Sequence, residues 1–135
     1  MITLSKDMEV GIALIDKQHR GLIDRLNEIT ELCTKRIDNK AETKKTLDLL
    51  ADYVVKHFKD EEEIMAKTKY PQLALQKQQH AQYIAELNAL QKEFAANGQS
   101  HRFSLELRNS IIDWIVKHIK SSDLAFGRYY RDNCK

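Results

Sequence analysis

The chain has 135 residues, the length of one domain, and 22 Lys and Arg against 20 Asp and Glu give a formal net charge of only +2. The two signs are interspersed along the sequence, which disfavours nucleic acid or an anionic membrane as a partner. Hydrophobic residues make up 42% of the chain, with only four Gly and one Pro, a composition typical of an all-helical domain. We therefore expect a single domain over residues 1–135 with one core.

The sequence also bears on the cellular compartment. Acidic residues at Asp7, Glu9 and Asp16 interrupt the first thirty residues, so no cleaved signal sequence is expected, and no apolar run approaches the roughly 20 residues of a membrane span. Cys33 and Cys134 lie far apart without a CxxC partner, which argues against a disulfide framework or a thiolate metal site. These features predict a cytoplasmic protein.

Apolar residues recur at steps of three and four in four segments, which predicts four helices. The segments are 15–33, 47–69, 73–97 and 107–129. Asp16 is available to cap the first helix, the Tyr70-Pro71 pair disfavours helix beyond the second, and Asn97-Gly98 is a typical C-terminal signal for the third. Because the connections are short, we expect an all-α, up-down-up-down four-helix bundle.

Polar residues interrupt each apolar stripe, and in the expected bundle they all lie toward the same end of the interior. They are His19, His57, Glu61, Gln76, His80, His118 and Asp123. A lone histidine in a core usually makes a single hydrogen bond. Several histidines with two carboxylates at one level would instead cost several kcal/mol per unpaired charge unless cations lay between them. The pattern therefore predicts a metal site in the bundle core.

The spacing of these residues supports a shared centre. His57 and Glu61 are four residues apart and face the same way on a helix. His118 and Asp123 are five apart, a step that we expect to rotate Asp123 off the stripe toward a second metal. Neutral imidazoles combined with carboxylates suit iron, with zinc or manganese as competitors.

Four pieces of the sequence carry a family resemblance in chain order. They are IDKQH (15–19), HFKDEE (57–62), KYPQLALQKQQH (69–80) and WIVKHIKSSD (114–123). Together they cover nearly the whole chain, and the combination resembles the hemerythrin family, specifically the bacterial hemerythrins.

The resemblance implies two iron ions bridged by two carboxylates and an oxo or hydroxo group. The bridging carboxylates would be Glu61 and Asp123. The imidazoles would divide between the irons, with His19 and His57 on the O2-binding iron and His80 and His118 on the other. Such a protein binds O2 reversibly, for carriage and storage or as an oxygen or redox sensor, and is not an enzyme.

Gln76 departs from the family pattern, which normally has histidine four residues before the position of His80. The amide oxygen of Gln76 could ligate the metal weakly, or it could hydrogen-bond a water or hydroxide that fills the position. We favour the second interpretation, because a neutral amide competes poorly with water for iron. Partial loss or substitution of one metal is the third alternative.

Other residues near the predicted ligands have two interpretations each. Five of them could line a ligand pocket or could simply pack in the core: Leu22, Ile23, Phe58, Trp114 and Ile119. Glu62 and Glu63 are one and two steps from Glu61, so we expect them to face solvent. His101 is expected to be a solvated loop residue.

Several functions compete with O2 carriage. A module that responds to NO or peroxide would also fit, with a signalling output domain if the chain belongs to a longer protein, and small anions are further candidate ligands. A zinc-binding bundle without redox chemistry is less favoured. A di-iron oxidase is disfavoured because such bundles use ExxH pairs, and no Glu stands three residues before any histidine in this sequence.

Overall fold

A computed structural model describes residues 2–34 and 40–134, and within these residues it contains helices and no strand. The first three long helices are α1 (Ala13–Thr34), α2 (Lys40–Lys67) and α3 (Leu73–Asn97). The remainder forms one continuous rod, the fourth arm, whose parts are α4 (His101–Glu106), η2 (Leu107–Ile112), α5 (Asp113–His118), η3 (Ile119–Asp123) and α6 (Leu124–Asn133). A short 3-10 helix, η1 (Lys6–Met8), precedes α1.

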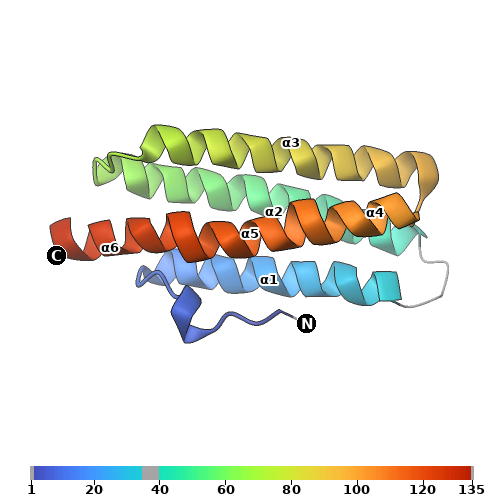
Figure 1. Cartoon of the computed structure of the whole chain (residues 1–135), viewed down its shortest axis with the longest axis horizontal. Helices are drawn as coiled ribbons and strands as arrows, with labels where there is room; N and C mark the ends of the chain where they lie inside the picture. The colour runs from blue at the N-terminus through green and yellow to red at the C-terminus, as the bar shows by residue number, and fades with distance from the viewer. Residues whose placement is uncertain (1, 35–39, 135) are drawn as a thin grey trace.

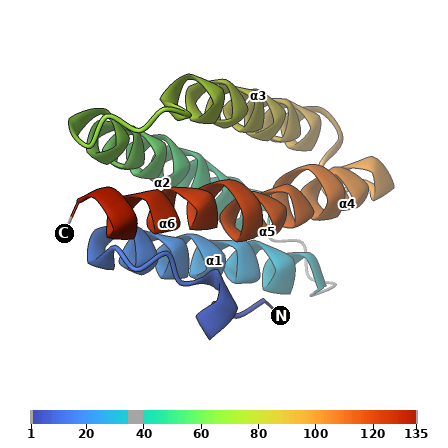
Figure 2. The same ribbon diagram turned by 60° about the vertical axis from the view of Figure 1, so that its left-hand side comes forward.

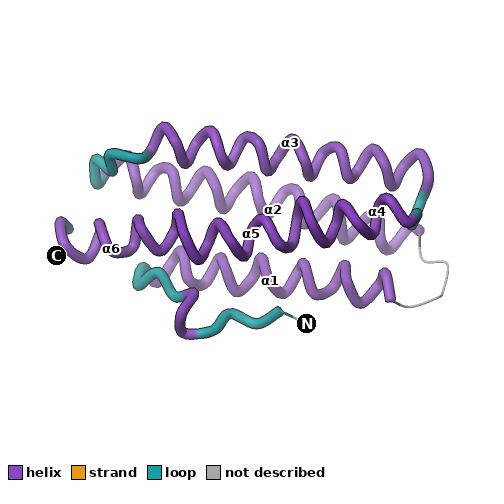
Figure 3. Tube along the Cα trace, in the orientation of Figure 1, coloured by secondary structure: helices purple, strands orange, loops and turns teal. Residues whose placement is uncertain are grey.

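The four rods lie side by side, and each runs antiparallel to the one before it in the chain (Figure 1). The fourth arm begins beside the end of α3 and returns along α1 toward the start of that helix, as the turned view confirms (Figure 2). Helix dominates the whole trace (Figure 3). The predicted all-α, up-down-up-down bundle is therefore confirmed. None of the helices in the described residues is both long and apolar enough to cross a membrane.

The helix ends follow local chemistry. Gly98 takes a φ of 64° after α3, and its N–H donates to the Phe94 carbonyl at 2.7 Å, as the Asn97-Gly98 pair predicts. The Ser100 side chain then caps α4 by accepting from the Phe103 N–H at 3.0 Å. The second and fourth rods begin earlier than the apolar stripes predict, and Thr43 and Phe103 in these added turns are buried.

Asp16 does not cap the first helix in the predicted way, since α1 already begins at Ala13. Its carboxylate instead accepts from the backbone N–H groups of Val10 at 2.7 Å and Gly11 at 3.1 Å. These two hydrogen bonds fix the turn that leads into α1 and hold the N-terminal segment against the bundle.

Within residues 2–34 and 40–134, the core consists of two apolar clusters separated along the bundle axis. The larger cluster contains Leu22, Phe58 and Ile115 among others, and the smaller contains Ile15, Met65 and Phe126. On each rod the polar residues of the predicted site fall between members of the two clusters. The polar layer is therefore closed off along the axis by apolar side chains on both sides.

The N-terminal segment packs tightly on α6 at Gly127. A Cβ at this position would lie 2.3 Å from the backbone oxygen of Val10. At Gly21 the corresponding clash, 2.2 Å, is with the Tyr53 hydroxyl at the end of a side chain that can move.

We expect Gly127→Ala to lower the free energy of unfolding by about 1–3 kcal/mol, because a backbone carbonyl cannot yield without shifting the N-terminal segment. Gly21→Ala is the matched control and should cost less, with the same gain in helix propensity. Urea unfolding of both variants at equal metal content measures the difference. Equal stability of the two variants would contradict the close packing of Val10 on α6.

Candidate metal centre

The structure brings six of the predicted site residues together in one layer of the core. They come from every rod: His19 from α1, His57 and Glu61 from α2, His80 from α3, His118 from α5 and Asp123 from η3. Each is no more than 5% exposed. The convergence at one end of the bundle therefore occurs as the sequence predicts.

Glu61 lies between two pairs of histidines. Its Oε2 is 3.5 Å from His19 Nε2 and 3.3 Å from His57 Nε2, while its Oε1 is 3.2 Å from His80 Nε2. The two oxygens of one carboxylate thus face different imidazole groups. We call His19 and His57 the first group, and His80 and His118 the second group.

Asp123 repeats this arrangement from the opposite rod. Its Oδ2 is 3.2 Å from His19 Nε2, in the first group, and its Oδ1 is 3.2 Å from His118 Nε2, in the second. Potential ligand atoms within 4.8 Å of one another form two sets, one with the first group and Glu61, the other with the second group, Glu61 and Asp123. The geometry is that of two adjacent cation sites sharing carboxylates.

Six of the ligand atoms have no hydrogen-bond partner. This holds for the Nε2 atoms of all four histidines and for both oxygens of Glu61, all of them buried. Their mutual N···O distances of 3.2–3.5 Å lack hydrogen-bond geometry, so the lone pairs converge on shared space rather than on each other. Buried polar atoms without partners are costly, and metal ions would satisfy them. The residues therefore fit a pair of cations.

Two imidazoles are oriented through their other ring nitrogen. His57 Nδ1 lies 2.8 Å from Gln18 Oε1, and His80 Nδ1 lies 2.8 Å from Glu62 Oε2. Both partners are acceptors, so each Nδ1 must donate, which leaves the Nε2 lone pair free for a metal. Gln18 is held in turn because its Nε2 donates to Asp60 Oδ2 at 2.8 Å.

The prediction that Glu62 is solvated is wrong. Its side chain is only 24% exposed and pairs with His80 on the neighbouring helix. Glu63, by contrast, is exposed, and so is His101. Sequence spacing missed both Glu62 and Gln18, because each acts on a histidine of another helix and no local repeat marks that relation.

The five-residue step from His118 to Asp123 behaves differently from its prediction. Residues 119–123 form a π-helical turn, in which hydrogen bonds join residues five apart. Asp123 is therefore returned to the face of His118 instead of being rotated away from it. Such turns are rare and often accompany functional sites.

Gln76 is buried beside the second group, 2% exposed. Its Nε2 donates to Asp123 Oδ1 at 3.2 Å, and its Oε1 has no hydrogen-bond partner. A carboxylate oxygen can only accept, so the amide nitrogen must face Asp123 and the amide oxygen must point elsewhere.

Aromatic rings flank the second group. The Phe58 ring stacks on His80 with centroids 3.8 Å apart, and the Trp114 ring stacks on His118 at 4.7 Å. Phe58 also belongs to the larger apolar cluster, together with Leu22, Ile23 and Ile119, while Trp114 packs against that cluster. This packing agrees with the core interpretation, and a ligand pocket lined by these residues stays a prediction.

The carboxylates and imidazoles of the centre shift one another's pKa values toward the charged forms. Burial lowers the pKa of His19, but the adjacent Asp123 and Glu61 outweigh burial and raise it to about 9. Burial raises the pKa of Glu61, yet His19, His57 and His80 hold it well below its usual range. The pKa of His80 is likewise raised, because Glu61 and Glu62 outweigh the effect of burial. The metal-free centre therefore holds protons where cations would lie.

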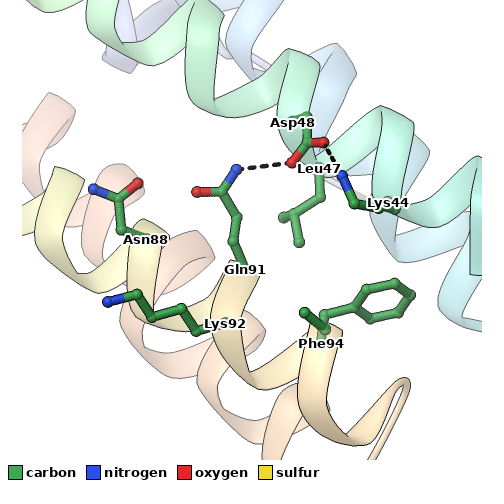
Figure 4. A pocket seen from close by; sticks show the side chains of 8 residues that line it. Lys44, Leu47, Asp48, Asn88, Gln91, Lys92 and Phe94 are labelled. Atoms are coloured by element: carbon green, nitrogen blue, oxygen red, sulfur yellow. Dashed lines mark hydrogen bonds and ion pairs between the residues drawn. The ribbon is translucent and has the colours of Figure 1, made fainter.

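A hollow of about 400 Å³ lies away from this centre, between the start of α2 and the end of α3 (Figure 4). Asp48 bridges its walls, accepting from Gln91 Nε2 at 2.9 Å and pairing with Lys44 Nζ at 2.8 Å. None of the predicted site residues lines it. The buried layer is therefore the part of the described structure with the chemistry to bind a metal.

Comparison with known proteins identifies the family. Residues 10–129 match the Hemerythrin HHE cation binding domain. The chain is 32% identical over 127 residues to a bacteriohemerythrin of Methylococcus capsulatus, covering 94% of each chain. It is 31% identical to a bacteriohemerythrin of Stenotrophomonas maltophilia, over 94% of this chain and 80% of that one. The chain belongs to the hemerythrin family.

A more distant relative is also a hemerythrin. The chain is 25% identical to the myohemerythrin of Sipunculus nudus, over 90% of this chain and 87% of that one. The segment that matches the hemerythrin family contains the six converging residues and Gln76. The resemblance read from the four sequence pieces is therefore confirmed.

We expect metal uptake at about pH 7 to release about one proton from His19, because its pKa of about 9 keeps it protonated without metal and a ligating imidazole must be neutral. Apparent metal affinity should then increase as the pH rises toward about 9 and level off above it. A pH indicator in weakly buffered solution measures the release, and His101→Gln is the control. Uptake without proton release would contradict the charge balance described above.

We also expect Glu62→Ala to weaken metal affinity by roughly 10–100-fold, because His80 would lose the acceptor that orients it. Glu63→Ala is the matched control, since Glu63 is the next residue and is exposed. Competition with a chromophoric chelator measures both variants. Equal affinities would show that Glu62 does not position His80.

Proposed function

We propose that this hemerythrin holds two iron ions in the buried layer and binds O2 there reversibly. One observation carries the proposal: Glu61 and Asp123 each direct one oxygen to the first group and the other oxygen to the second. Carboxylates placed in this way suit two cations close together, since each can bridge them and offset their repulsion. Imidazole and carboxylate donors together suit iron.

The proposal assigns each residue a role. His19 and His57 would hold one iron, and His80 and His118 the other. Glu61 and Asp123 would bridge the pair, and Gln76 would stand beside the second iron. When bound, a pair of ferrous ions supplies the electrons that reversible O2 binding requires.

The chain itself buries this layer and orients its imidazoles. Apolar clusters close it on both sides along the axis, and stacked rings flank the second group. The bonds from Gln18 and Glu62 hold the orientations of His57 and His80. Membership of the hemerythrins agrees with the prediction that the chain is not an enzyme.

Some parts of the proposal rest on the sequence alone. We take residues 1–135 as one hemerythrin-like domain, of which the family match covers 10–129. Carriage versus sensing, NO or peroxide as ligand, an attached signalling output domain and a cytoplasmic location stay predictions.

We expect the purified protein to contain about two iron ions per chain, and Glu61→Ala and Asp123→Ala each to lose the pair, because one carboxylate alone leaves the cations too little negative charge. Metal analysis and the optical spectrum of the ferrous protein before and after exposure to air measure the effect. Glu63→Ala, at an exposed position two residues from Glu61, is the control.

Two results would overturn the proposal. Full iron content with an unchanged charge-transfer spectrum in both bridging variants would reject the ligand assignment. Normal iron content without a reversible spectral change on admitting and removing O2 would reject O2 binding while leaving the metal centre intact.

A further inference from the structure

The second group differs from the first in having an amide beside it. Gln76 Nε2 is committed to Asp123 Oδ1, the same oxygen that His118 Nε2 faces at 3.2 Å. Its Oε1 is buried and has no hydrogen-bond partner. An unpaired acceptor that is buried calls for a proton donor or a cation. The amide oxygen therefore marks a place for something that the protein chain does not supply.

Two hollows approach this half of the centre from outside. One of about 220 Å³ is lined by Gln76, Gln79, Ser121 and Ser122, among others. The other, of about 240 Å³, includes His118 and Lys117 in its lining and shares Gln79, Ser121 and Ser122 with the first. The first hollow thus reaches Gln76, and the second reaches His118 of the second group.

A hydrogen bond joins two residues that line both hollows. Ser122 Oγ donates to Gln79 Oε1 at 3.0 Å and joins η3 to α3. Both residues are partly buried, and both belong to the lining of each hollow. Their linings combine polar side chains with apolar ones, Leu75 and Ala125 in the first hollow and Trp114 in the second. Gln76 and His118 are therefore the residues of this half that line hollows open to the outside of the bundle.

We propose that Gln76 reserves a coordination position on the second metal for an exchangeable protic ligand, water or hydroxide, which enters past Ser122 and Gln79. The proposal rests on the two-metal function proposed above. The ligand would donate its hydrogen to Gln76 Oε1 and so satisfy the buried acceptor. Gln76 is thus a positioning residue for that ligand and not itself a metal ligand.

Three observations favour water over direct ligation by the amide. A neutral amide is a weak donor compared with water for a transition metal. Two hollows reach this half of the centre from outside, one at Gln76 and the other at His118. The acceptor character of Gln76 Oε1, enforced by the bond from Nε2 to Asp123, selects a ligand that brings a proton and disfavours anions such as azide, which bring none.

The test counts bound water on the manganese(II)-loaded protein, using hyperfine coupling to ¹⁷O-enriched water. Gln76→His supplies an imidazole at the reserved position, and Gln78→His, at an exposed site two residues away, is the matched control. We expect the wild type and Gln78→His to coordinate one more water per chain than Gln76→His. An equal count in wild type and Gln76→His, at equal metal content, would show that the imidazole replaces no bound water and would overturn the proposal.

A second variant keeps the test informative if Gln76→His fails to fold or to load metal. Ser122→Ala removes the bond to Gln79 without touching a proposed ligand, and it should speed water exchange at the centre, measured by proton relaxation of bulk water. Unchanged exchange would reject the proposed route. Failure of wild type to take up two metals would instead count against the proposed function, so the two failures can be told apart.

Discussion

The metal centre depends on a layer of histidines and carboxylates that is buried in the middle of an apolar core. Four imidazole nitrogens and two carboxylates face one another at 3.2–3.5 Å, and neither the Nε2 atoms of the four histidines nor the oxygens of Glu61 have a hydrogen-bond partner. Removing any one charge from such a layer leaves its partners buried and unpaired, which is strongly unfavourable. Cations, or protons in their absence, are what make this layer compatible with a folded bundle.

The rest of the architecture holds this layer of polar side chains in position. Apolar residues one turn before and after the ligands on each rod form the two clusters that enclose the layer. The π turn at 119–123 changes the helical repeat where it is needed, so that Asp123 and His118 share one face. Because the ligand residues lie on packed helices and not on loops, their ligand atoms are preorganised and do not have to be ordered by the metal.

The two halves of the centre are not equivalent. In the first, the orienting partner of His57 is the neutral amide of Gln18. In the second, His80 is paired with the carboxylate of Glu62, which makes an imidazole a stronger donor. This is also the half in which Gln76 stands where the hemerythrin resemblance implies histidine. A more basic His80 would donate more strongly to that metal and would offset part of the donor strength lost with the missing imidazole.

Local periodicity was sufficient for the bundle and for the six converging residues. The 3.6-residue repeat places His57 and Glu61 on one face whatever surrounds them, and Asn97-Gly98 ends α3 through backbone preferences alone. Other features depended on how the helices pack. Glu62 reaches His80, and Gln18 reaches His57, only because neighbouring helices meet at a particular rotation and register, which no spacing within one helix encodes.

The same reason explains the remaining differences. The π turn that realigns Asp123 is a response to packing of the fourth arm, since a regular α-helix would satisfy the same local preferences. The orientation of the Gln76 amide was likewise decided by an acceptor on a different rod. The sequence alone therefore determined which side chains point inward, because that follows from helical geometry. Only the tertiary structure decided which atoms of those side chains meet, because that depends on contacts between residues far apart in the chain.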